Sequence, residues 1–426
     1  MKAEIVTGLG FGDEGKGTIV DYLCRKAKGK RWVVRFKGGS QCGHTVDADA
    51  LNRTISHRFA QFGSGTLAGV PTLLADRVLV NPFTLIHEAN ALYGKGLSHP
   101  MSMVFISANC WVTTPYHRIL NQARELARNS RHGSCGMGIG ETVAHAIARP
   151  GDVLFISDLA NQDRTHAKLS RILSYVEAQA EENNLHLNCL LDPQFSVENI
   201  AKSYTQFLSS GVTVIPSSEE LISLYDHVVF EGAQGVLLDE WAGFHPYTTW
   251  SNTTADWAWD LLAKVHNENA REIGVIRAFH TRHGNGPFPS QITGDPGKIA
   301  KVLAEDDNGT NEWQGDFRVG MLDLPLLKYA LCAAQTVGSI AVTWCDQQYP
   351  AVVKSYQNLN QSALFPRTGR SGLDPIDRQS QTEALYNANP VIEFVKVGID
   401  KLIEHETGAK VSILSMGRKS CDKIEI

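Results

Sequence analysis

The sequence lacks the marks of an exported, membrane-spanning or disulfide-rich protein. It has no Cys-x-x-Cys pair and no run of eighteen apolar residues, and its N-terminus leads straight into a short apolar segment instead of a signal peptide. Its eight cysteines are scattered singly along 426 residues, which favours reduced thiols over a disulfide framework or a zinc site. We therefore expect a cytoplasmic protein without a membrane-spanning helix.

A clear excess of one charge is also missing. Forty Lys and Arg residues face forty-five Asp and Glu residues, which gives a formal charge of -5, and no block of like charges stands out. Nucleic acid and anionic membranes are therefore not expected as general partners. Internal repeats and low-complexity tracts are absent as well. A chain of this length can bury a large core, in one domain or in two.

Short apolar runs recur along the chain and predict a parallel β-sheet, because strands buried on both faces have this composition. They occupy Glu4–Thr7, Trp32–Phe36, Val104–Ser107, His227–Phe230, Gly274–Ala278, Ile340–Thr343 and Val411–Leu414. Segments with helical character lie between them, for example Thr18–Ala27, Ile119–Arg128 and Leu169–Glu182. The pattern favours an α/β fold with helices flanking a largely parallel central sheet. Residues 151–225 and 350–400 carry no recognisable chemistry and are expected to be peripheral.

A glycine-rich loop, Gly8–Gly17, lies between the first predicted strand and the first predicted helix. Residues 10–16 fit the phosphate-loop pattern G-x-x-x-x-G-K, although Gly17 stands where Ser or Thr is usual. The loop also fits the dinucleotide pattern G-x-G-x-x-G, but the acidic residue expected about twenty positions later is missing. Glycine N–H groups at a helix N-terminus, together with Lys16, predict an anion site.

Two carboxylates and a histidine add chemistry to this loop. Asp13 and Glu14 would repel a phosphate, so they make sense where one of them binds a metal ion or takes a proton from a second substrate. The next glycine-rich block, Gly38–Thr45, supplies His44. A phosphate cradle combined with a carboxylate and a histidine indicates phosphoryl transfer onto a weakly acidic group.

The blocks GDEGKG at residues 12–17 and GHT at residues 43–45 resemble the adenylosuccinate synthetase family. Further blocks agree in the same order, at Gly133–Gly140, Phe230–Asp239, Pro246–Tyr247 with Ser251–Thr254, and Thr281–Arg282 with Gly284–Pro289. The resemblance extends from residue 4 to about residue 420, so we expect one domain over residues 1–426. It implies a P-loop NTPase-like sheet with smaller helical and antiparallel excursions. The implied enzyme phosphorylates O6 of IMP, or of a related 6-oxopurine nucleotide, from GTP and then joins L-aspartate at C6, which gives adenylosuccinate, GDP and phosphate on the route to AMP.

The resemblance also implies roles for individual residues. Asp13 would be the general base on purine N1 and, with the Gly43 carbonyl, a Mg²⁺ ligand. His44 would hydrogen-bond the bridging oxygen, Lys16 the phosphates and Gln234 the O6 atom. The GTP site would further use Gly12, Glu14, Gly15, Gly17, Thr18, Thr45, Trp344, Cys345, Asp346, Ser415, Met416 and Gly417. The nucleotide substrate would contact Gln41, Ser134, Cys135, Thr249 and, from the second subunit of a homodimer, Arg149, while Arg318 would serve both sites.

Several positions depart from the family pattern. Gln41 replaces an asparagine that contacts nucleotide phosphate, Cys135 replaces a threonine, and Met137 replaces an arginine. Trp344 replaces the lysine that covers guanine, so ATP stays open as the phosphoryl donor. The arginine-rich loop that grips the aspartate carboxylates is Glu312–Gly320 here, and Arg318 is its one remaining arginine.

These departures leave three alternatives to the expected activity. The amine could differ from aspartate. The substrate could be a guanine nucleotide, as in phage-type relatives that make 2-aminoadenylosuccinate, although the retained Asp13 favours the base-assisted route because that group has serine there. The chain could also be a non-catalytic paralogue that only binds purine nucleotides. Asp13, Lys16, His44 and Gln234 argue against the last alternative, because a binding protein needs neither a base nor an acid.

Overall fold

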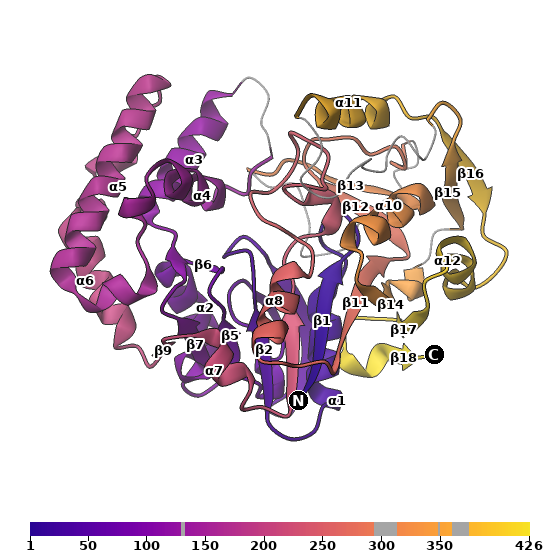
Figure 1. The fold of residues 1–426 in the computed structure, drawn as a ribbon, viewed down its shortest axis with the longest axis horizontal. Helices are drawn as coiled ribbons and strands as arrows, with labels where there is room; N and C mark the ends of the chain where they lie inside the picture. Colours follow the sequence, from indigo (N-terminus) through magenta and orange to yellow (C-terminus); the bar gives the residue numbers. More distant parts are fainter. Residues whose placement is uncertain (129–132, 294–312, 348–349, 360–374) are drawn as a thin grey trace.

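A ten-stranded sheet forms the centre of the molecule in the computed structural model, which describes residues 1–128, 133–293, 313–347, 350–359 and 375–426. The strand order is β18-β17-β14-β11-β1-β10-β2-β5-β7-β9, and neighbouring strands are parallel except for β17 and β18. These strands are β1 Lys2–Gly8, β2 Arg31–Arg35, β5 Thr72–Leu74, β7 Val104–Ser107, β9 Thr213–Ile215, β10 His227–Glu231, β11 Ala270–Arg277, β14 Val337–Thr343, β17 Val411–Ser415 and β18 Lys423–Glu425. Figure 1 shows β1 near the middle of the molecule. The expected α/β fold with a largely parallel sheet is confirmed.

All seven predicted strands belong to this sheet, and their observed ends lie within four residues of the predicted ones. The pattern missed β5, β9 and β18, which have three residues each. A three-residue strand gives no readable alternation or apolar run, so its position is fixed by pairing with its neighbour. The longer strands were therefore predictable, whereas the three-residue strands were not, whether they lie at the sheet edge, as β9 and β18 do, or inside the sheet, as β5 does.

The three predicted helices are also present, as α1 Lys16–Lys26, α3 Pro115–Ala127 and α5 Gln162–Glu182. Helix α3 begins four residues before its predicted start. Thr114 caps it by accepting a hydrogen bond from the His117 backbone N–H, and Pro115 takes the first helical position, where no N–H is needed.

Helices cover both faces of the sheet near β1, and alternate residues of each strand pack against one helix or the other. Val6 and Val229 pack with Ile19 and Leu23 of α1 on one face. On the other face, Ile5, Val34 and Phe230 pack with Ala258 and Leu262 of α8, which spans Asp256–Lys264. Burial on both faces explains why these strands read as continuous apolar runs. It also fixes the loop between β1 and α1 at the carboxyl edge of the sheet.

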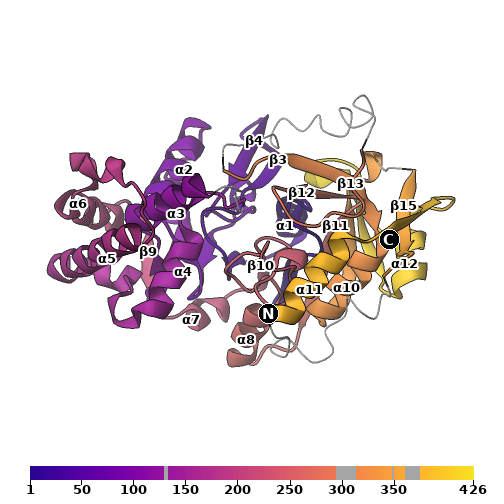
Figure 2. The same cartoon turned by 90° about the horizontal axis from the view of Figure 1, so that it is seen from above.

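Two groups of elements extend the molecule at opposite ends (Figures 1 and 2). One end carries the helices α2 Pro82–Gly94, α3, α4 Ile139–Ala148, α5 and α6 Val197–Leu208. The other carries α10 Leu324–Ala334, α11 Pro375–Tyr386, α12 Ile399–Thr407 and a four-stranded sheet of β12 Phe279–His283, β13 Phe317–Asp323, β15 Ala351–Tyr356 and β16 Pro390–Phe394. A hairpin of β3 His44–Ala50 and β4 Arg53–Phe59 is antiparallel, like the pairs β12–β13 and β15–β16. In the described part of the chain, no helix combines the length and apolar character needed to cross a membrane.

Candidate active site

Two cavities meet at the carboxyl edge of the central sheet. The larger has a volume of about 280 Å³ and the smaller about 70 Å³. Five residues line both of them: Asp13, Lys16, Gly43, His44 and Arg58. The glycine-rich loop and the GHT block therefore lie side by side at this edge. Together they border the junction between the two cavities.

The glycine-rich loop is held from below by one of its own carboxylates. Glu14 Oε1 accepts hydrogen bonds from the backbone N–H groups of Gly10 and Gly12, both at 2.9 Å, and Glu14 Oε2 lies 2.5 Å from Lys16 Nζ. The Glu14 side chain is 2% exposed, and a Cβ on Gly8 would lie 2.4 Å from its Oε2 atom. Glycine is required there because the carboxylate occupies the space of a side chain. The Glu14 carboxylate thus shapes the loop and faces away from the cavities.

Asp13 takes the opposite direction and borders both cavities. Its backbone has a φ of 58°, next to Gly12 with a φ of 90°, and this turn sends the two neighbouring carboxylates to different sides. Asp13 Oδ2 lies 3.2 Å from His283 Nε2, at the end of β12. Burial favours the neutral acid, but the hydrogen bond with His283 and the charges of Arg277 and Lys16 hold the pKa of Asp13 below its ordinary value. Asp13 is therefore an ionised acceptor at the junction.

His44 is oriented by a buried carboxylate. Its Nδ1 lies 2.5 Å from Oε1 of Glu231, which ends β10 and is fully buried. Ser64 donates to the same carboxylate from its backbone N–H at 2.9 Å. Burial raises the pKa of Glu231, yet the nearby Arg35 and the His44 contact lower it to about 2. Burial lowers the pKa of His44 and outweighs the opposing effect of Glu231. A neutral imidazole that donates from Nδ1 leaves Nε2 as its second polar atom.

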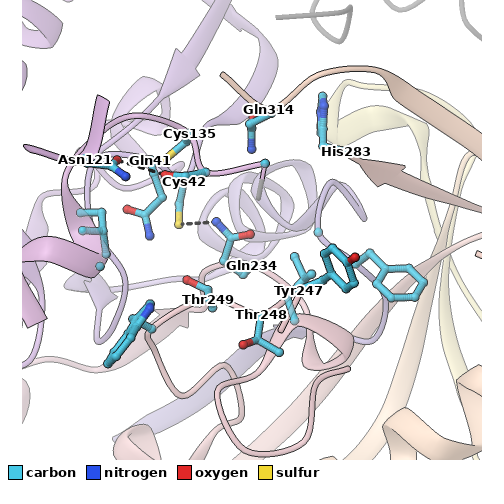
Figure 3. A pocket seen from close by; sticks show the side chains of 18 of the residues that line it. Gln41, Cys42, Asn121, Cys135, Gln234, Tyr247, Thr248, Thr249, His283 and Gln314 are labelled. Atoms are coloured by element: carbon cyan, nitrogen blue, oxygen red, sulfur yellow. Dashed lines mark hydrogen bonds between the residues drawn. The ribbon is translucent and has the colours of Figure 1, made fainter. Parts of the chain in front are cut away.

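Amide side chains point into the larger cavity (Figure 3). Gln234 follows β10, has a φ of 60°, and donates from Nε2 to Cys42 Sγ at 3.3 Å. Both amide atoms of Gln41 are buried and have no hydrogen-bond partner among the described residues. A buried amide without partners is costly, so its presence beside a cavity indicates a ligand that supplies them. Thr248 and Thr249 line another side of the same space.

The smaller cavity is strongly basic. Four cationic side chains line it, those of Lys16, Arg58, Arg277 and Arg418, against the single carboxylate of Asp13. The Arg277 guanidinium lies 4.8 Å from the centroid of the Trp344 ring and donates to the backbone carbonyl of Asp13. Such an excess of positive charge in a concave space favours a polyanion. Thr343 also donates to the Glu14 carbonyl at 2.6 Å, so the end of β14 is tied directly to the loop.

Most of the residues predicted for the site lie at these cavities. The larger is lined by Gly12, Asp13, Lys16, Gln41, Gly43, His44, Ser134, Cys135, Gln234 and Thr249, and the smaller by Asp13, Gly15, Lys16, Gly17, Thr18, Gly43, His44, Thr45 and Trp344. Cys345 and Asp346 follow β14 and Met416 and Gly417 follow β17, where Ser415 is the last residue; these two strands are neighbours. The structure thus brings the two segments predicted for base recognition to one edge.

Eight predicted residues are not among the described residues that line either cavity: the strand-end residues Cys345, Asp346, Ser415, Met416 and Gly417, and also Glu14, Arg149 and Arg318. Glu14 is turned under the loop, as shown above. Arg149 is exposed at the C-terminal end of α4 and is not among the described residues that line either cavity. Arg318 donates to the Gly286 carbonyl at 3.0 Å and to Gln291 Oε1 at 3.3 Å, and it likewise does not line either cavity. Glu312, the first residue of the altered loop, falls outside the described residues.

Sequence reasoning missed Glu231 behind His44, and it missed the polar cavity residues His283, Arg58, Arg277 and Arg418, among others. Glu231 lies inside the recognised block Phe230–Asp239, so its place beside a site was readable even though its partner was not. His283 lies between two recognised segments, Thr281–Arg282 and Gly284–Pro289. Arg58 is in no recognised block, and its only sequence signal is a basic residue in an alternating hairpin strand.

The fold and the junction together define a phosphate-loop α/β enzyme in which a carboxylate, a lysine and a histidine lie between two cavities. A family model described as adenylosuccinate synthetase matches residues 5–371. The chain belongs to the adenylosuccinate synthetase family, and it is accordingly a ligase that forms a carbon–nitrogen bond.

Similar proteins agree with this assignment. The adenylosuccinate synthetase of Thermoplasma acidophilum is 30% identical over 450 residues, which cover 98% of this chain and 96% of that protein. That of Francisella tularensis subsp. tularensis is 31% identical over 350 residues, covering 81% and 78%. Among solved structures, the fully ligated adenylosuccinate synthetase of Plasmodium falciparum has a TM-score of 0.79 at 19% identity, with both chains covered in full. The succinoaminodeoxyadenylate synthetase of cyanophage S-2L, bound to dGMP and dATP, has a TM-score of 0.60 at 16% identity, covering 100% and 95%. The two structures support the fold.

Proposed function

We propose that this chain converts IMP, GTP and L-aspartate into adenylosuccinate, GDP and phosphate. The observation that carries the proposal is the position of Asp13, an ionised carboxylate at the junction of a basic cavity and an amide-lined cavity. The basic cavity suits the triphosphate and the amide-lined cavity suits the purine nucleotide. An acceptor between them is what activation of a weakly acidic lactam requires.

In the first step, Asp13 takes the N1 proton of IMP while electron density moves to O6. The O6 lone pair then forms a bond to the γ-phosphorus of GTP, the bond from that phosphorus to the β–γ bridging oxygen breaks, and GDP leaves with the electron pair. Lys16 offsets charge on the donor phosphates. His44, fixed through Nδ1 by Glu231, presents Nε2 to the oxygen between purine and phosphoryl group, and the added negative charge there favours its protonation.

In the second step, the amino group of aspartate attacks C6, and phosphate departs with O6. Gln234, which follows β10 and lines the larger cavity, would contact O6, and the amide of Gln41, which has no hydrogen-bond partner among the described residues, would contact the nucleotide. The nucleotide would also contact Ser134, Cys135 and Thr249. Arg149 would contact the 5′-phosphate of the nucleotide bound in the second subunit of a homodimer. Arg149 suits that role because it is exposed at the end of α4 and lies away from its own cavity walls.

The guanine base of GTP would lie beyond the smaller cavity. Trp344, Cys345 and Asp346 approach it from the end of β14, and Ser415, Met416 and Gly417 from the end of β17. Asp346 would accept hydrogen bonds from guanine N1 and N2, which adenine cannot offer. The loop residues Gly12 to Thr18, with Thr45, hold the phosphates, Glu14 through its backbone because its side chain faces away.

Mg²⁺ fits the junction. Asp13 and Gly43 border both cavities, and a carboxylate with a backbone carbonyl is a donor set that Mg²⁺ accepts alongside substrate phosphates. When bound, Mg²⁺ neutralises charge on the phosphates.

The carboxylates of the L-aspartate substrate need a cationic partner, and we propose Arg318 for this role. Its guanidinium would give up the hydrogen bond to the Gly286 carbonyl and bind the substrate instead.

The direct test is turnover by the purified protein with IMP, GTP, L-aspartate and Mg²⁺. We expect phosphate release that depends on all four, with adenylosuccinate identified by mass spectrometry. An Asp13→Ala variant is the control for chemistry. It should lose turnover by about a thousandfold or more and still bind GTP, because binding needs the cradle and transfer needs the base. Release that does not require IMP, or a product other than adenylosuccinate across a panel of amines and 6-oxopurine nucleotides, would contradict the proposal.

The homodimer is tested by complementation between subunits. Arg149→Leu subunits should be inactive alone because the phosphate contact is lost in both sites. Mixed with Asp13→Ala subunits, they should regain about a quarter of the activity, since in a mixed dimer one of the two sites carries both intact residues. No recovery on mixing would remove the shared-site arrangement.

A further inference from the structure

Arg58 stands where the two cavities join, and nothing in the steps above uses it. It is one of only five described residues that line both spaces, with Asp13, Lys16, Gly43 and His44. The other four belong to the two glycine-rich blocks. Arg58 comes from the neighbouring strand β4, so it reaches the junction from a separate element.

The hairpin explains this position. In the β3–β4 ladder Arg58 is paired with Thr45, which lines the smaller cavity. Burial alternates along both strands: His44 and Phe59 are buried, whereas Arg58 lies on the opposite, exposed face. From that face the guanidinium leans back against the residue before His44. A Cβ on Gly43 would lie 2.1 Å from Arg58 Nε and 3.0 Å from Nη2.

Two consequences follow from that approach. A side chain on Gly43 would displace the Arg58 guanidinium from its observed position. The planar end of Arg58 is also held within a few ångströms of the Gly43–His44 backbone, where Asp13, Lys16 and His44 converge. A guanidinium is the side chain best suited to hold two phosphate oxygens at once, since its N–H groups form a rigid fork.

We propose that Arg58 is a catalytic residue that contacts the γ-phosphoryl group of the nucleoside triphosphate while it passes to the purine oxygen. The proposal rests on the proposed function. As the bond from phosphorus to the β–γ bridging oxygen breaks and the bond to O6 forms, negative charge spreads over the equatorial oxygens. The Arg58 fork stabilises that charge from the hairpin side, while Lys16 acts from the loop side. The N1 proton still goes to Asp13, and the breaking electron pair still goes to GDP.

The experiment isolates the first step by positional isotope exchange. GTP labelled with ¹⁸O at the β–γ bridge is incubated with enzyme, IMP and Mg²⁺ in the absence of any amine, so scrambling of the label reports reversible transfer alone. Arg58→Ala should slow scrambling by about a hundredfold or more, because arginine contacts to a transferring phosphoryl group contribute on that scale. Arg58→Lys should recover part of the loss, since the charge remains and the fork does not.

The matched control is Arg53→Ala. Arg53 lies on the same strand, is exposed, and donates to the Lys95 carbonyl outside both cavities. Scrambling by this variant should stay within about threefold of the parent enzyme, as expected of a surface substitution. Scrambling by Arg58→Ala at the parent rate, or a loss equal to that of Arg53→Ala, would overturn the proposal.

A binding measurement separates this proposal from the proposed function. The affinities of a β,γ-methylene GTP analogue and of GDP are compared by calorimetry with Mg²⁺ present. Arg58→Ala should weaken the analogue by about tenfold and leave GDP unchanged, because only the analogue carries a γ-phosphate. Equal weakening of both ligands would overturn the contact. If the parent enzyme scrambles no label with IMP, the proposed function fails, and the ratio of the two affinities still decides whether Arg58 meets the γ-phosphate.

Discussion

Glu231 accepts a hydrogen bond from His44 across 2.5 Å, and this contact joins the end of β10 to the start of β3. The carboxylate is fully buried and is itself held by the backbone N–H of Ser64. A buried carboxylate behind an imidazole fixes both the ring orientation and the tautomer. The second ring nitrogen, Nε2, is thereby left for chemistry.

Glu231→Gln should lower kcat by about tenfold to a hundredfold, with KM values for IMP and GTP within about threefold, because the amide does not stabilise the imidazolium that forms during transfer. The measurement is steady-state turnover together with a thermal melt of each variant. Ser64→Ala is the graded control, because it removes one hydroxyl from the same carboxylate and leaves the charge in place. An unchanged kcat in Glu231→Gln would show that His44 needs no orientation.

His283 positions Asp13 through the contact between Nε2 and Oδ2. Replacement by leucine removes that hydrogen bond and leaves the carboxylate free to rotate, so kcat should fall by about tenfold with smaller changes in KM. His283→Asn should restore part of the rate, since its side-chain N–H can donate to the same oxygen. Equal rates for the leucine variant and the parent would contradict a positioning role.

Asp346 should decide between guanine and adenine. Asp346→Asn replaces an acceptor of two hydrogen bonds, so kcat/KM with GTP should fall by about a hundredfold, and kcat/KM with ATP should change by less than about threefold. The readout is the ratio of the two values. Glu393→Gln, an exposed carboxamide substitution on β16, serves as the control for loss of one surface charge. A parallel fall with both triphosphates would assign Asp346 to structure.

Asp323 should make stability depend on pH. It is fully buried, accepts from the Leu326 N–H and from the Tyr356 hydroxyl, and burial raises its pKa to about 7. Its folded pKa lies above the unfolded value, so its contribution to stability is complete below about pH 4 and is lost as the pH rises to about 7. Asp323→Asn keeps the side-chain oxygen that caps the helix. It should reduce the pH-dependent loss of unfolding free energy by about 2 kcal/mol.

Urea unfolding at pH 5 and pH 8 measures this difference. The parent should lose stability between the two values, and Asp323→Asn should lose less. Asp163→Asn, an exposed change in the first turn of α5, should leave the parent slope unaltered. Identical slopes for Asp323→Asn and the parent would show that Asp323 does not titrate in this window.

The sequence was sufficient for the sheet strands of four or more residues, because burial on both faces selects apolar residues along the whole segment. Trp32–Phe36 and Val411–Leu414 are read as strands without any knowledge of their partners. The strand β9 is not, since it has only three residues, two of them exposed at the sheet edge, and it pairs with β7 alone. Local pattern is informative where the environment is uniform along the segment.

The site was only partly predictable for a related reason. Motifs identified Asp13, Lys16, His44 and Gln234, because each of these residues lies within a short sequence block that indicates its role. The contact of His283 with Asp13 spans 270 positions, and only the fold brings the two together. Glu14 shows the reverse situation, because adjacency to Asp13 in sequence does not reveal that the two side chains point to opposite sides of the loop.

The Glu14 carboxylate gives the phosphate loop an internal counter-ion. It accepts hydrogen bonds from two backbone amide groups of the loop and from the ammonium of Lys16. Hydrogen bonds within the loop preorganise it, and a preorganised loop lowers the conformational cost of binding a triphosphate. The enzyme can therefore bind and release its donor many times with little rearrangement of the strand-to-helix turn.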